Sequence, residues 1–300
     1  MLPFTKAVPK EMLPIGNKPL IQYAVEEAAA SGIEEIILVT RGDKPALERH
    51  FATDPTLEEI LGRQGRKQEL DAVRSLSKLA KITSVRQDSP RGLGDALLCA
   101  RPFVDGQPFA VILPDAIISA AQPALSQLIA AYSRRPASYV ATQSVEPEDV
   151  VRFGMLAVDM KEDSASPGVL RVRGVVEKPT QGDAPSHYGV FGRYLFEPEI
   201  FDFLDCVANP GREEARLSDA LTLLCRQRVL YALCFDGKHY DAGNKLGYLQ
   251  AVVDFALEAA ETRSAVQSIL TKQCASIAPE PHDADYRASV PERDLLERAR

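Results

Sequence analysis

The sequence has no surplus of positive charge, no closely paired cysteines and no long apolar segment. Its 300 residues carry 35 Lys and Arg against 42 Asp and Glu, so it lacks the basic surface that nucleic acids and anionic membranes require. The five cysteines form no CxxC pair, which argues against a disulfide framework or a zinc site. No stretch approaches the length of a membrane span or has the pattern of a signal peptide. We therefore expect a cytoplasmic protein that binds no nucleic acid and no membrane.

Strand and helix patterns alternate through the first half of the chain. Helical spacing at 18–31, 94–100 and 123–132 alternates with short apolar runs at 36–39, 82–85 and 109–113. Unbroken apolar runs are typical of strands buried on both faces, so the pattern predicts an α/β fold with a mostly parallel central sheet flanked by helices. Beyond residue 138 strands dominate and helices then resume. We expect one domain over residues 1–260, followed at 261–300 by a C-terminal helix and a loosely packed tail.

A charged segment at 54–79 interrupts this alternation. It has helical spacing, and its acidic residues are interleaved with Arg and Lys. This mixture predicts a solvated helical insert rather than a basic binding site. Such an insert could also form a subunit interface.

Two aspartates follow predicted strands and are candidate metal ligands. Asp115 ends the segment VILPD, and Asp241 lies between an apolar strand and the helix that starts near Lys245. Ligands of open α/β sheets gather at the carboxyl ends of strands, and two carboxylates suit a hard cation such as Mg²⁺. Asp115 could equally be a turn or N-cap residue, and Asp241 taken alone favours the N-cap, whereas the two together favour the metal.

Two further segments could contact an anion or a base. Residues 86–100 predict a strand end, a glycine-containing loop and a helix start, an arrangement that presents backbone N–H groups, although such glycines are as often simple turn residues. Glu177 and Lys178 end another strand, where they would point to opposite faces as an exposed edge pair. Alternatively, Lys178 and Lys10 could neutralise phosphate oxygens. The four histidines show no metal-ligand spacing and no triad, so any phosphoryl chemistry would depend on lysines and magnesium.

Taken in order, the segments KEMLP, GLGDALLCA, VILPD, VVEKP, FGRY and YDAGNKLGYLQA resemble the bacterial UTP–glucose-1-phosphate uridylyltransferases, within the sugar-nucleotide pyrophosphorylases. The resemblance covers residues 1 to about 255. It implies a Rossmann-like nucleotidyltransferase fold, Mg²⁺ as cofactor and a homo-oligomer as the assembly. It also implies that a glucose 1-phosphate oxygen attacks the α-phosphorus of UTP, releasing pyrophosphate and forming UDP-glucose.

The resemblance also implies roles for individual residues. Lys10 would lie near the nucleotide phosphates and Lys178 at the sugar phosphate, as the catalytic lysines. Gln87 and Gly92 would contact the uracil edge, and Gly154 and Glu177 the sugar. Asp115 and Asp241 would hold magnesium.

Some features depart from the family pattern. The first strand and its GxGTR loop, roughly twenty residues in all, are expected before MLP, and we hypothesise that Met1 is an internal methionine. Asp95 replaces an expected histidine, where its charge should weaken anion binding unless the carboxylate points away. Phe153 replaces a tyrosine, and Arg216, Leu217 and Ser218 replace glutamine, leucine and threonine. These departures leave two alternatives open: a weakened regulatory paralogue that binds a true uridylyltransferase, or a sugar-1-phosphate thymidylyltransferase.

Overall fold

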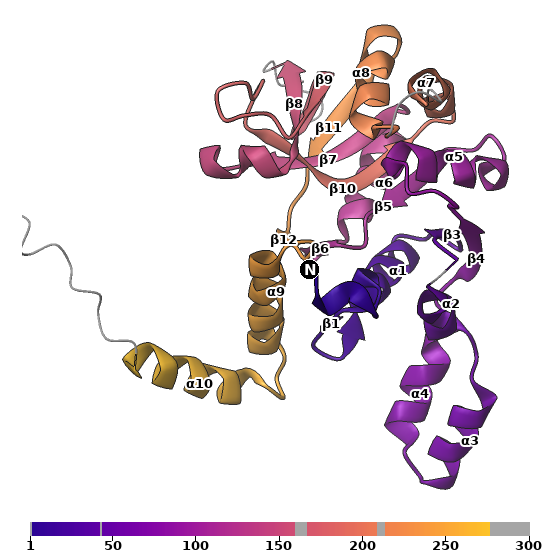
Figure 1. The fold of residues 1–300 in the computed structure, drawn as a ribbon, viewed down its shortest axis with the longest axis vertical. Helices are drawn as coiled ribbons and strands as arrows, with labels where there is room; N and C mark the ends of the chain where they lie inside the picture. Colours follow the sequence, from indigo (N-terminus) through magenta and orange to yellow (C-terminus); the bar gives the residue numbers. More distant parts are fainter. Residues whose placement is uncertain (1, 43, 160–166, 209–213, 277–300) are drawn as a thin grey trace, which may run out of the picture. The chain divides into compact units, whose positions relative to one another are not determined.

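The computed structural model describes all residues except 1, 43, 160–166, 209–213 and 277–300, so the predicted tail lies largely outside the described residues (Figure 1). The chain divides into two compact units, residues 1–251 and 252–300. The predicted domain boundary near residue 260 stays a prediction. Among the described helices, none combines the length and the apolar character needed to cross a membrane.

A six-stranded sheet forms the centre of the first unit. Its only parallel pairing among the described strands joins β7 to β11, and the other pairings are antiparallel. The prediction of a mostly parallel central sheet is therefore wrong for these strands. An apolar run indicates that both faces of a strand are buried. Antiparallel strands are also buried in this way when helices cover both sides of the sheet. In spatial order the strands are β5 (Phe109–Ile112), β10 (Tyr188–Phe196), β7 (Ser138–Ser144), β11 (Leu230–Cys234), β9 (Val169–Glu177) and β8 (Gly154–Asp159).

Both faces of this sheet are buried beneath helices. On one face Val140 and Leu156 pack in a cluster with residues of α5, α7 and α8. On the other, Tyr139 and Met155 pack against α6. Neighbouring residues of one strand thus enter opposite clusters, as the two-residue period of a strand requires. The four helices that pack on the sheet are α5 (Gly92–Val104), α6 (Ala124–Arg134), α7 (Ile200–Val207) and α8 (Leu217–Gln227).

A separate two-stranded sheet supplies the parallel pair that the apolar runs predict. Strand β3 (Glu35–Thr40) pairs in parallel with β4 (Lys81–Arg86). The backbone N–H of Gln87 extends the ladder by donating to the Thr40 carbonyl at 2.9 Å. The carboxyl ends of both strands therefore meet at Thr40 and Gln87. Whether a first strand is absent stays a prediction.

Short elements complete the first unit. A tight turn at Gly16, whose φ of +61° favours glycine, joins β1 (Pro14–Ile15) to β2 (Lys18–Pro19). Strands β6 (Ala116–Ser119) and β12 (Lys238–Asp241), far apart in the sequence, form an antiparallel pair. The remaining helices are α1 (Leu20–Ala30), α2 (Pro45–Phe51), α3 (Pro55–Arg63), α4 (Lys67–Leu76), α9 (Lys245–Glu258), which crosses the boundary between the units, α10 (Arg263–Ser276) of the second unit, and the 3₁₀ turns η1 (Phe4–Lys6), η2 (Lys10–Met12) and η3 (Pro147–Arg152).

Helices α3 and α4 occupy the charged segment at 54–79, and its status as an insert stays a prediction. Helix α4 has no buried residue, and the Arg74 side chain reaches Glu58 of α3 at 2.8 Å. A second pair, Glu59 and Arg63, lies at helical spacing on the exposed face of α3. Such exposed pairs contribute little to stability, so they describe a solvated helical pair.

One ion pair joins α1 to the six-stranded sheet. Arg193 of β10 is 1% exposed and donates through two nitrogens to both carboxylate oxygens of Glu27, at 2.8 and 3.0 Å. Its third nitrogen donates to the Leu113 carbonyl at 3.2 Å, and Glu27 also accepts the backbone N–H of Leu125 at the start of α6. Four segments therefore depend on one buried pair, whose hydrogen-bonding groups are matched.

Replacing only Arg193 should destabilise the first unit strongly. Arg193→Met leaves Glu27 buried without its cation, at a cost of about 3–5 kcal/mol. The double variant Arg193→Met/Glu27→Gln should lose less, because an uncharged amide still accepts from Leu125. Urea unfolding followed by circular dichroism measures both variants. Arg63→Met, which breaks an exposed pair, serves as the control, and an equal loss in Arg63→Met and Arg193→Met would contradict this interpretation.

Candidate active site

Asp115 and Asp241 face the same small space. The β6–β12 pairing sets Asp241 opposite Ala116, and the backbone N–H of Ala242 donates to the Asp115 carbonyl at 2.8 Å. A Cβ atom placed on Gly243 would lie 3.1 Å from Asp241 Oδ1 and 3.2 Å from Asp115 Oδ2. The two carboxylates thus approach one point from either side, and only a residue without a side chain leaves that point open.

Neither aspartate caps a long helix, so the N-cap interpretation of Asp241 is wrong. The residue that caps α9 is Asn244, whose Oδ1 accepts the backbone N–H of Gly247 at 2.9 Å. Asp241 instead accepts from the Gly243 N–H at 3.1 Å and the Asn244 side chain at 2.7 Å, which fixes its carboxylate within the turn.

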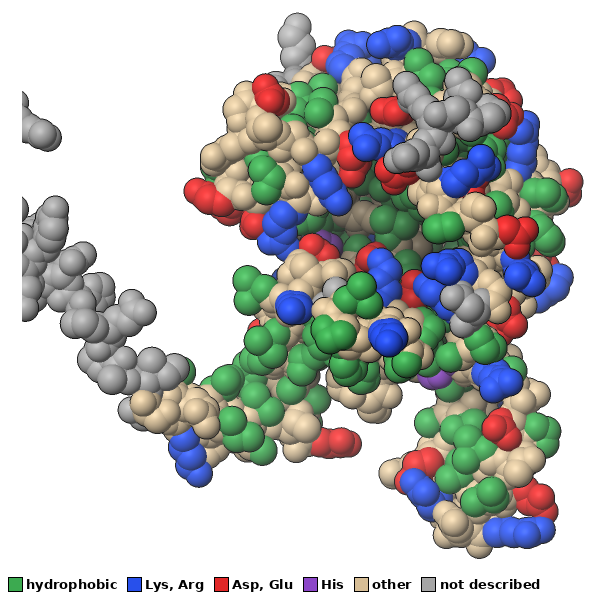
Figure 2. All heavy atoms as spheres, viewed as in Figure 1, with side chains coloured by type: hydrophobic (Ala, Val, Ile, Leu, Met, Phe, Trp, Pro, Cys, Tyr) green, Lys and Arg blue, Asp and Glu red, His purple; other side chains and the backbone are tan. Residues whose placement is uncertain are grey.

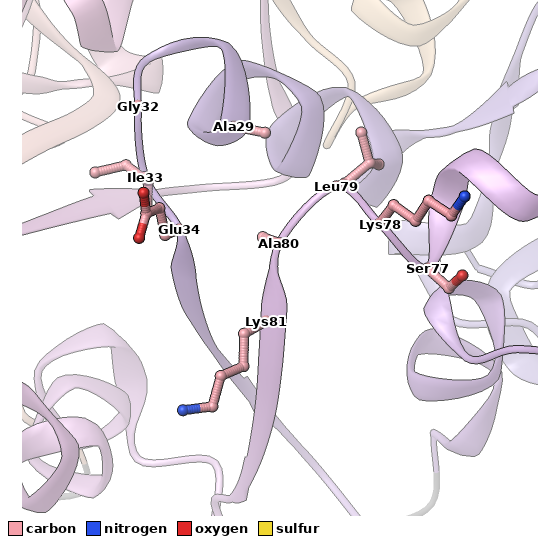
Figure 3. A pocket seen from close by; sticks show the side chains of 9 residues that line it. All are labelled: Ala29, Gly32, Ile33, Glu34, Ser77, Lys78, Leu79, Ala80 and Lys81. Atoms are coloured by element: carbon pink, nitrogen blue, oxygen red, sulfur yellow. The ribbon is translucent and has the colours of Figure 1, made fainter.

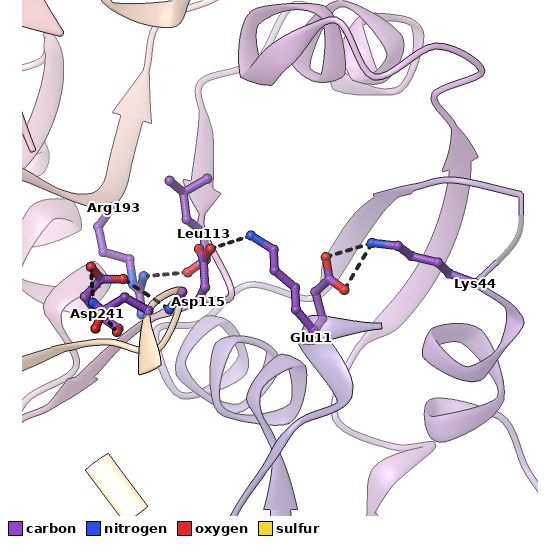
Figure 4. A network of polar contacts seen from close by, with 9 residues as sticks. Glu11, Lys44, Leu113, Asp115, Arg193 and Asp241 are labelled. Atoms are coloured by element: carbon purple, nitrogen blue, oxygen red, sulfur yellow. Dashed lines mark hydrogen bonds and ion pairs between the residues drawn. The ribbon is translucent and has the colours of Figure 1, made fainter. Parts of the chain in front are cut away.

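Lys10 is the cation next to Asp115. Its Nζ lies 2.6 Å from Asp115 Oδ2, and its side chain is 46% exposed. Burial alone would lower the pKa of Lys10, but the neighbouring carboxylates of Asp115, Glu11 and Asp241 outweigh it and raise that pKa. Glu11 in turn accepts a hydrogen bond from the Lys44 ammonium group at 2.9 Å. Figure 4 shows this pair together with the contact between Arg193 and the Leu113 carbonyl. Lys10 therefore places a positive charge beside the two carboxylates.

Arg152 matches Asp241 in the same way, and the sequence analysis missed it. Its guanidinium donates to Asp241 at 3.1 Å and to Asp149 at 2.7 Å. Burial would raise the pKa of Asp241, but the hydrogen bonds from Arg152, Asn244 and Gly243 lower it overall. Each of the two carboxylates thus lies beside its own cation. The only sequence signal for Arg152 is its position just before Phe153 and Gly154.

The two carboxylates fit a hard divalent cation as a partial ligand set. Carboxylate oxygens are the ligands that Mg²⁺ uses, and Mg²⁺ commonly takes its remaining ligands from phosphates and water. Over the described residues no cluster of three or more His, Cys, Asp or Glu side chains is suited to holding a metal. Asp115 and Asp241 could therefore hold a cation that arrives with a phosphate ligand, rather than an ion held by the protein alone.

Gly154, Glu177 and Lys178 lie together on a hairpin next to Arg152. The β8–β9 register sets Gly154 opposite Glu177, and a Cβ on Gly154 would lie 3.4 Å from Glu177 Oε2. Glu177 ends β9, while Lys178 has a left-handed φ of +43° and donates its N–H to the Phe153 carbonyl at 3.1 Å. The prediction that these two residues alternate along a strand is therefore wrong. A lysine in this conformation stores strain on the order of 1 kcal/mol, which is typical of functional positions.

Buried side chains connect this hairpin to the aspartates. Burial raises the pKa of the Tyr194 phenol, and the negative charges of Glu177 and Asp115 raise it further. Tyr194 thus lies close enough to both carboxylates for each to affect its pKa. His239 packs against the rings of Phe153 and Phe191, and this burial lowers its pKa to about 4. A neutral His239 is a packing residue, not a cation of the site.

Gln87 and Gly92 contact each other at the carboxyl end of β4. Gln87 Nε2 donates to the Gly92 carbonyl at 3.1 Å and to Asp95 Oδ2 at 2.8 Å. Gly92 has a φ of +90°, and a Cβ there would meet Glu214 at 2.6 Å, so this position requires glycine. The Gly94 N–H already donates to the Ala215 carbonyl at 3.0 Å. The predicted loop is present, but that N–H is not free for an anion.

Figure 2 shows one face of the molecule hollowed between the part that carries the six-stranded sheet and the part that carries α1, with acidic and basic side chains at the rim. A different depression is lined by residues at the end of α1, after α4 and at the start of β4, and its side chains do not converge (Figure 3). It lies at the amino-terminal ends of β3 and β4, away from Asp115, Asp241 and Gln87. The candidate active site is therefore the space between Asp115 and Asp241, and not this depression.

A model of the nucleotidyl transferase family matches residues 1–257. The chain belongs to the nucleotidyl transferase family. It is 42% identical to the UTP–glucose-1-phosphate uridylyltransferase of Bacillus subtilis strain 168 over 87% of this chain and 88% of that one. A relative of the same name from Staphylococcus epidermidis strain RP62A is also 42% identical, with 86% and 88% covered. The resemblance found in the sequence is thereby confirmed.

Solved structures of this nucleotidyl transferase family show the same fold. A crystal structure of apo UDP-glucose pyrophosphorylase superposes with a TM-score of 0.79 at 36% identity, covering 86% of this chain and 94% of that one. The UTP-bound UGPase from Acinetobacter baumannii gives a TM-score of 0.79 at 32% identity, with 90% and 93% covered. A UDP-glucose pyrophosphorylase complexed with UDP-glucose gives 0.77 at 36% identity, with 86% and 94% covered. The mixed α/β nucleotidyltransferase fold is therefore established for this chain.

Adding one methyl group at Gly243 should separate the two aspartates. The Cβ contacts of 3.1 and 3.2 Å are tighter than ordinary van der Waals contact, so one carboxylate must move. We expect Gly243→Ala to weaken binding of Mg²⁺ with UTP about tenfold, measured by isothermal titration calorimetry. Gly182→Ala is the matched control, because a Cβ there meets nothing within 4 Å. Unchanged binding by Gly243→Ala would mean that the carboxylates do not converge on the ligand.

Proposed function

We propose that this chain transfers the uridylyl group of UTP to glucose 1-phosphate, forming UDP-glucose and releasing pyrophosphate. The observation that carries the proposal is the convergence of Asp115 and Asp241 on the space beside Gly243, with Lys10 at its edge. A pair of carboxylates with adjacent cations suits a nucleotide triphosphate and its metal. The names of the relatives and of the solved structures support UTP and UDP-glucose as ligands.

The proposed reaction exchanges one P–O bond for another. A phosphate oxygen of glucose 1-phosphate attacks the α-phosphorus of UTP, and the bond between the α-phosphorus and the α,β-bridging oxygen breaks, so that pyrophosphate leaves with its electron pair. Because the attacking oxygen is already an anion, no general base is needed. Catalysis then depends on positioning and on neutralising charge.

The chain's own residues would share these tasks. Asp115 and Asp241 would hold Mg²⁺, which when bound neutralises phosphate charge. Lys10 would bind the nucleotide phosphates, and Lys178 the phosphate of the sugar. Glu177 would accept hydrogen bonds from glucose hydroxyls, with Gly154 leaving room opposite it. Gln87 and Gly92 would contact the uracil ring. Assembly as a homo-oligomer and a cytoplasmic location stay predictions.

The departure at Asp95 is compatible with this function. The Asp95 carboxylate is turned toward Arg91, at 2.6 Å, and toward Gln87. Its negative charge is therefore matched by an adjacent cation instead of facing an incoming anion. This contact fulfils the condition under which an aspartate near a nucleotide does not weaken binding.

A pyrophosphate-release assay tests the reaction and the metal ligands together. Purified protein with UTP, glucose 1-phosphate and Mg²⁺ should release pyrophosphate, and Asp115→Asn should lower kcat by at least about 100-fold. Asp105→Asn is the control, because Asp105 is an exposed helix C-cap with a φ of +48° that asparagine also adopts. Near-normal turnover by Asp115→Asn would remove Asp115 from the mechanism. A preference for dTTP over UTP would move the chain to the thymidylyltransferases, and no release with either nucleotide would favour the regulatory alternative.

A charge-neutral substitution tests Lys178. Lys178→Gln should lower kcat/KM for glucose 1-phosphate about 100-fold while changing the KM for UTP little, because only the sugar phosphate loses its cation. Lys178→Gly removes both the charge and the backbone strain, whereas Lys178→Gln removes the charge alone. The two variants should therefore have the same activity, and Lys178→Gly should be the more stable. Lys81→Gln, in an exposed pair with Glu35, is the control. Equal losses toward both substrates would assign Lys178 a structural role.

A further inference from the structure

The Gln87 amide is held in one orientation by two neighbours that can only accept hydrogen bonds. Its Nε2 donates one hydrogen to the Gly92 carbonyl at 3.1 Å and the other to Asp95 Oδ2 at 2.8 Å. The Gly92 carbonyl and the Asp95 carboxylate, which also accepts from Arg91, act only as acceptors, so an inverted amide would set oxygen against oxygen at both contacts. Within the described part of the chain, no hydrogen bond to Gln87 Oε1 occupies this acceptor. The side chain therefore offers an acceptor, and no donor, to a ligand.

Asp95 is the residue that makes this orientation stable. It lies in the first turn of α5 and is only 7% exposed, and its other oxygen accepts from Arg91 at 2.6 Å. The Arg91 guanidinium sets a positive charge directly beside the Asp95 carboxylate. Gln87 is fixed from the other side, because its backbone N–H donates to Thr40. Both ends of the Gln87–Asp95 hydrogen bond are thus anchored in regular structure.

The orientation of this amide decides which pyrimidine edge it can match. Uracil and thymine carry an N–H donor at N3, which pairs with an amide oxygen. Cytosine carries an unprotonated acceptor at N3, which faces the same oxygen unfavourably. A polar group that meets the wrong partner in a buried site costs far more than a missing methyl contact.

We propose that Asp95 is a specificity-determining positioning residue, which fixes the Gln87 amide so that the site accepts a base with an N3 donor and rejects cytosine. This inference rests on the proposed function for the placement of Gln87 against the base. It assigns Asp95 no contact with the nucleotide itself. It also predicts that Asp95 has no influence on the choice between uracil and thymine, since both carry the same N3–H group.

The test compares UTP, CTP and dTTP in the wild-type chain, Asp95→Ala, Asp95→Asn and Asp88→Ala. For each protein, kcat and KM are measured by pyrophosphate release with glucose 1-phosphate and Mg²⁺, and Kd is measured by calorimetry without the sugar. Asp95→Ala frees the amide to invert, so the ratio of kcat/KM for UTP to that for CTP should fall about tenfold. The change should lie in KM and Kd rather than in kcat. The ratio of UTP to dTTP should not change.

Two variants separate positioning from folding. Asp95→Asn keeps an oxygen that accepts from Gln87 and should restore most of the discrimination against CTP. Asp88→Ala removes a nearby carboxylate whose side chain is exposed, and should behave as the wild type. If Asp95→Ala does not fold, a thermal unfolding scan shows it, and Asp95→Leu replaces it as the variant without an acceptor.

The outcomes distinguish this inference from the proposed function. In one outcome, the wild type turns over UTP while Asp95→Ala keeps the wild-type ratio of kcat/KM for UTP to that for CTP. That result overturns the inference and leaves the proposed function standing. An equal loss toward all three nucleotides also overturns it, because Asp95 would then be merely structural. If the wild type binds UTP without turnover, the proposed function fails, and the Kd ratios alone decide the role of Asp95. If it binds no nucleotide, both fail.

Discussion

The buried ion pair between Arg193 and Glu27 is the contact on which the arrangement of the site depends. It joins strand β10, which lies next to the edge strand β5, to α1, and the same guanidinium donates to the Leu113 carbonyl, two residues before Asp115. Burying two charges stabilises a fold only when each hydrogen-bonding group finds a partner, and here the backbone N–H of Leu125 takes part as well. The segment that follows β5 is thus fixed by this contact, while the Asp115 carboxylate stays partly exposed. A fixed backbone beneath an accessible side chain suits the metal-binding role that we propose for Asp115.

The charges of the site are balanced before any ligand enters. Lys10 matches Asp115, and Arg152 matches Asp241, so the two carboxylates can lie on either side of Gly243 without strong mutual repulsion. In the proposed function, a cation bound by Asp115 would weaken the 2.6 Å contact of Lys10, because the two positive charges would repel each other. The half-exposed ammonium group of Lys10 would then be available to phosphate oxygens.

Local patterns predicted most elements, but not how they pair. The apolar run in Tyr139–Gln143 correctly predicts β7, yet nothing in it tells whether Tyr194 of β10 approaches in the parallel or the antiparallel sense. Pairing is decided by contacts between segments far apart in the chain. The same limit applies to the site. Asp115, Asp241, Gly154 and Glu177 carry sequence signals, whereas Arg152 has only its position before Phe153 and Gly154, because its contact with the site is to a residue 89 positions away, at 3.1 Å. The left-handed conformation of Lys178 could not be predicted either, because backbone propensity alone would not place a lysine in that region.

The two halves of the proposed site differ in how firmly their polar groups are held, and this difference suits the ligands that we propose for each half. Phosphates are recognised by charge, which tolerates exposed lysines such as Lys10 and Lys178. A base edge is recognised by the direction of single hydrogen bonds, which requires an amide that cannot invert. The buried Asp95, together with the left-handed Gly92, supplies that constraint at the end of β4. A substitution in the phosphate half should therefore change rate, whereas one behind Gln87 should change which base is accepted.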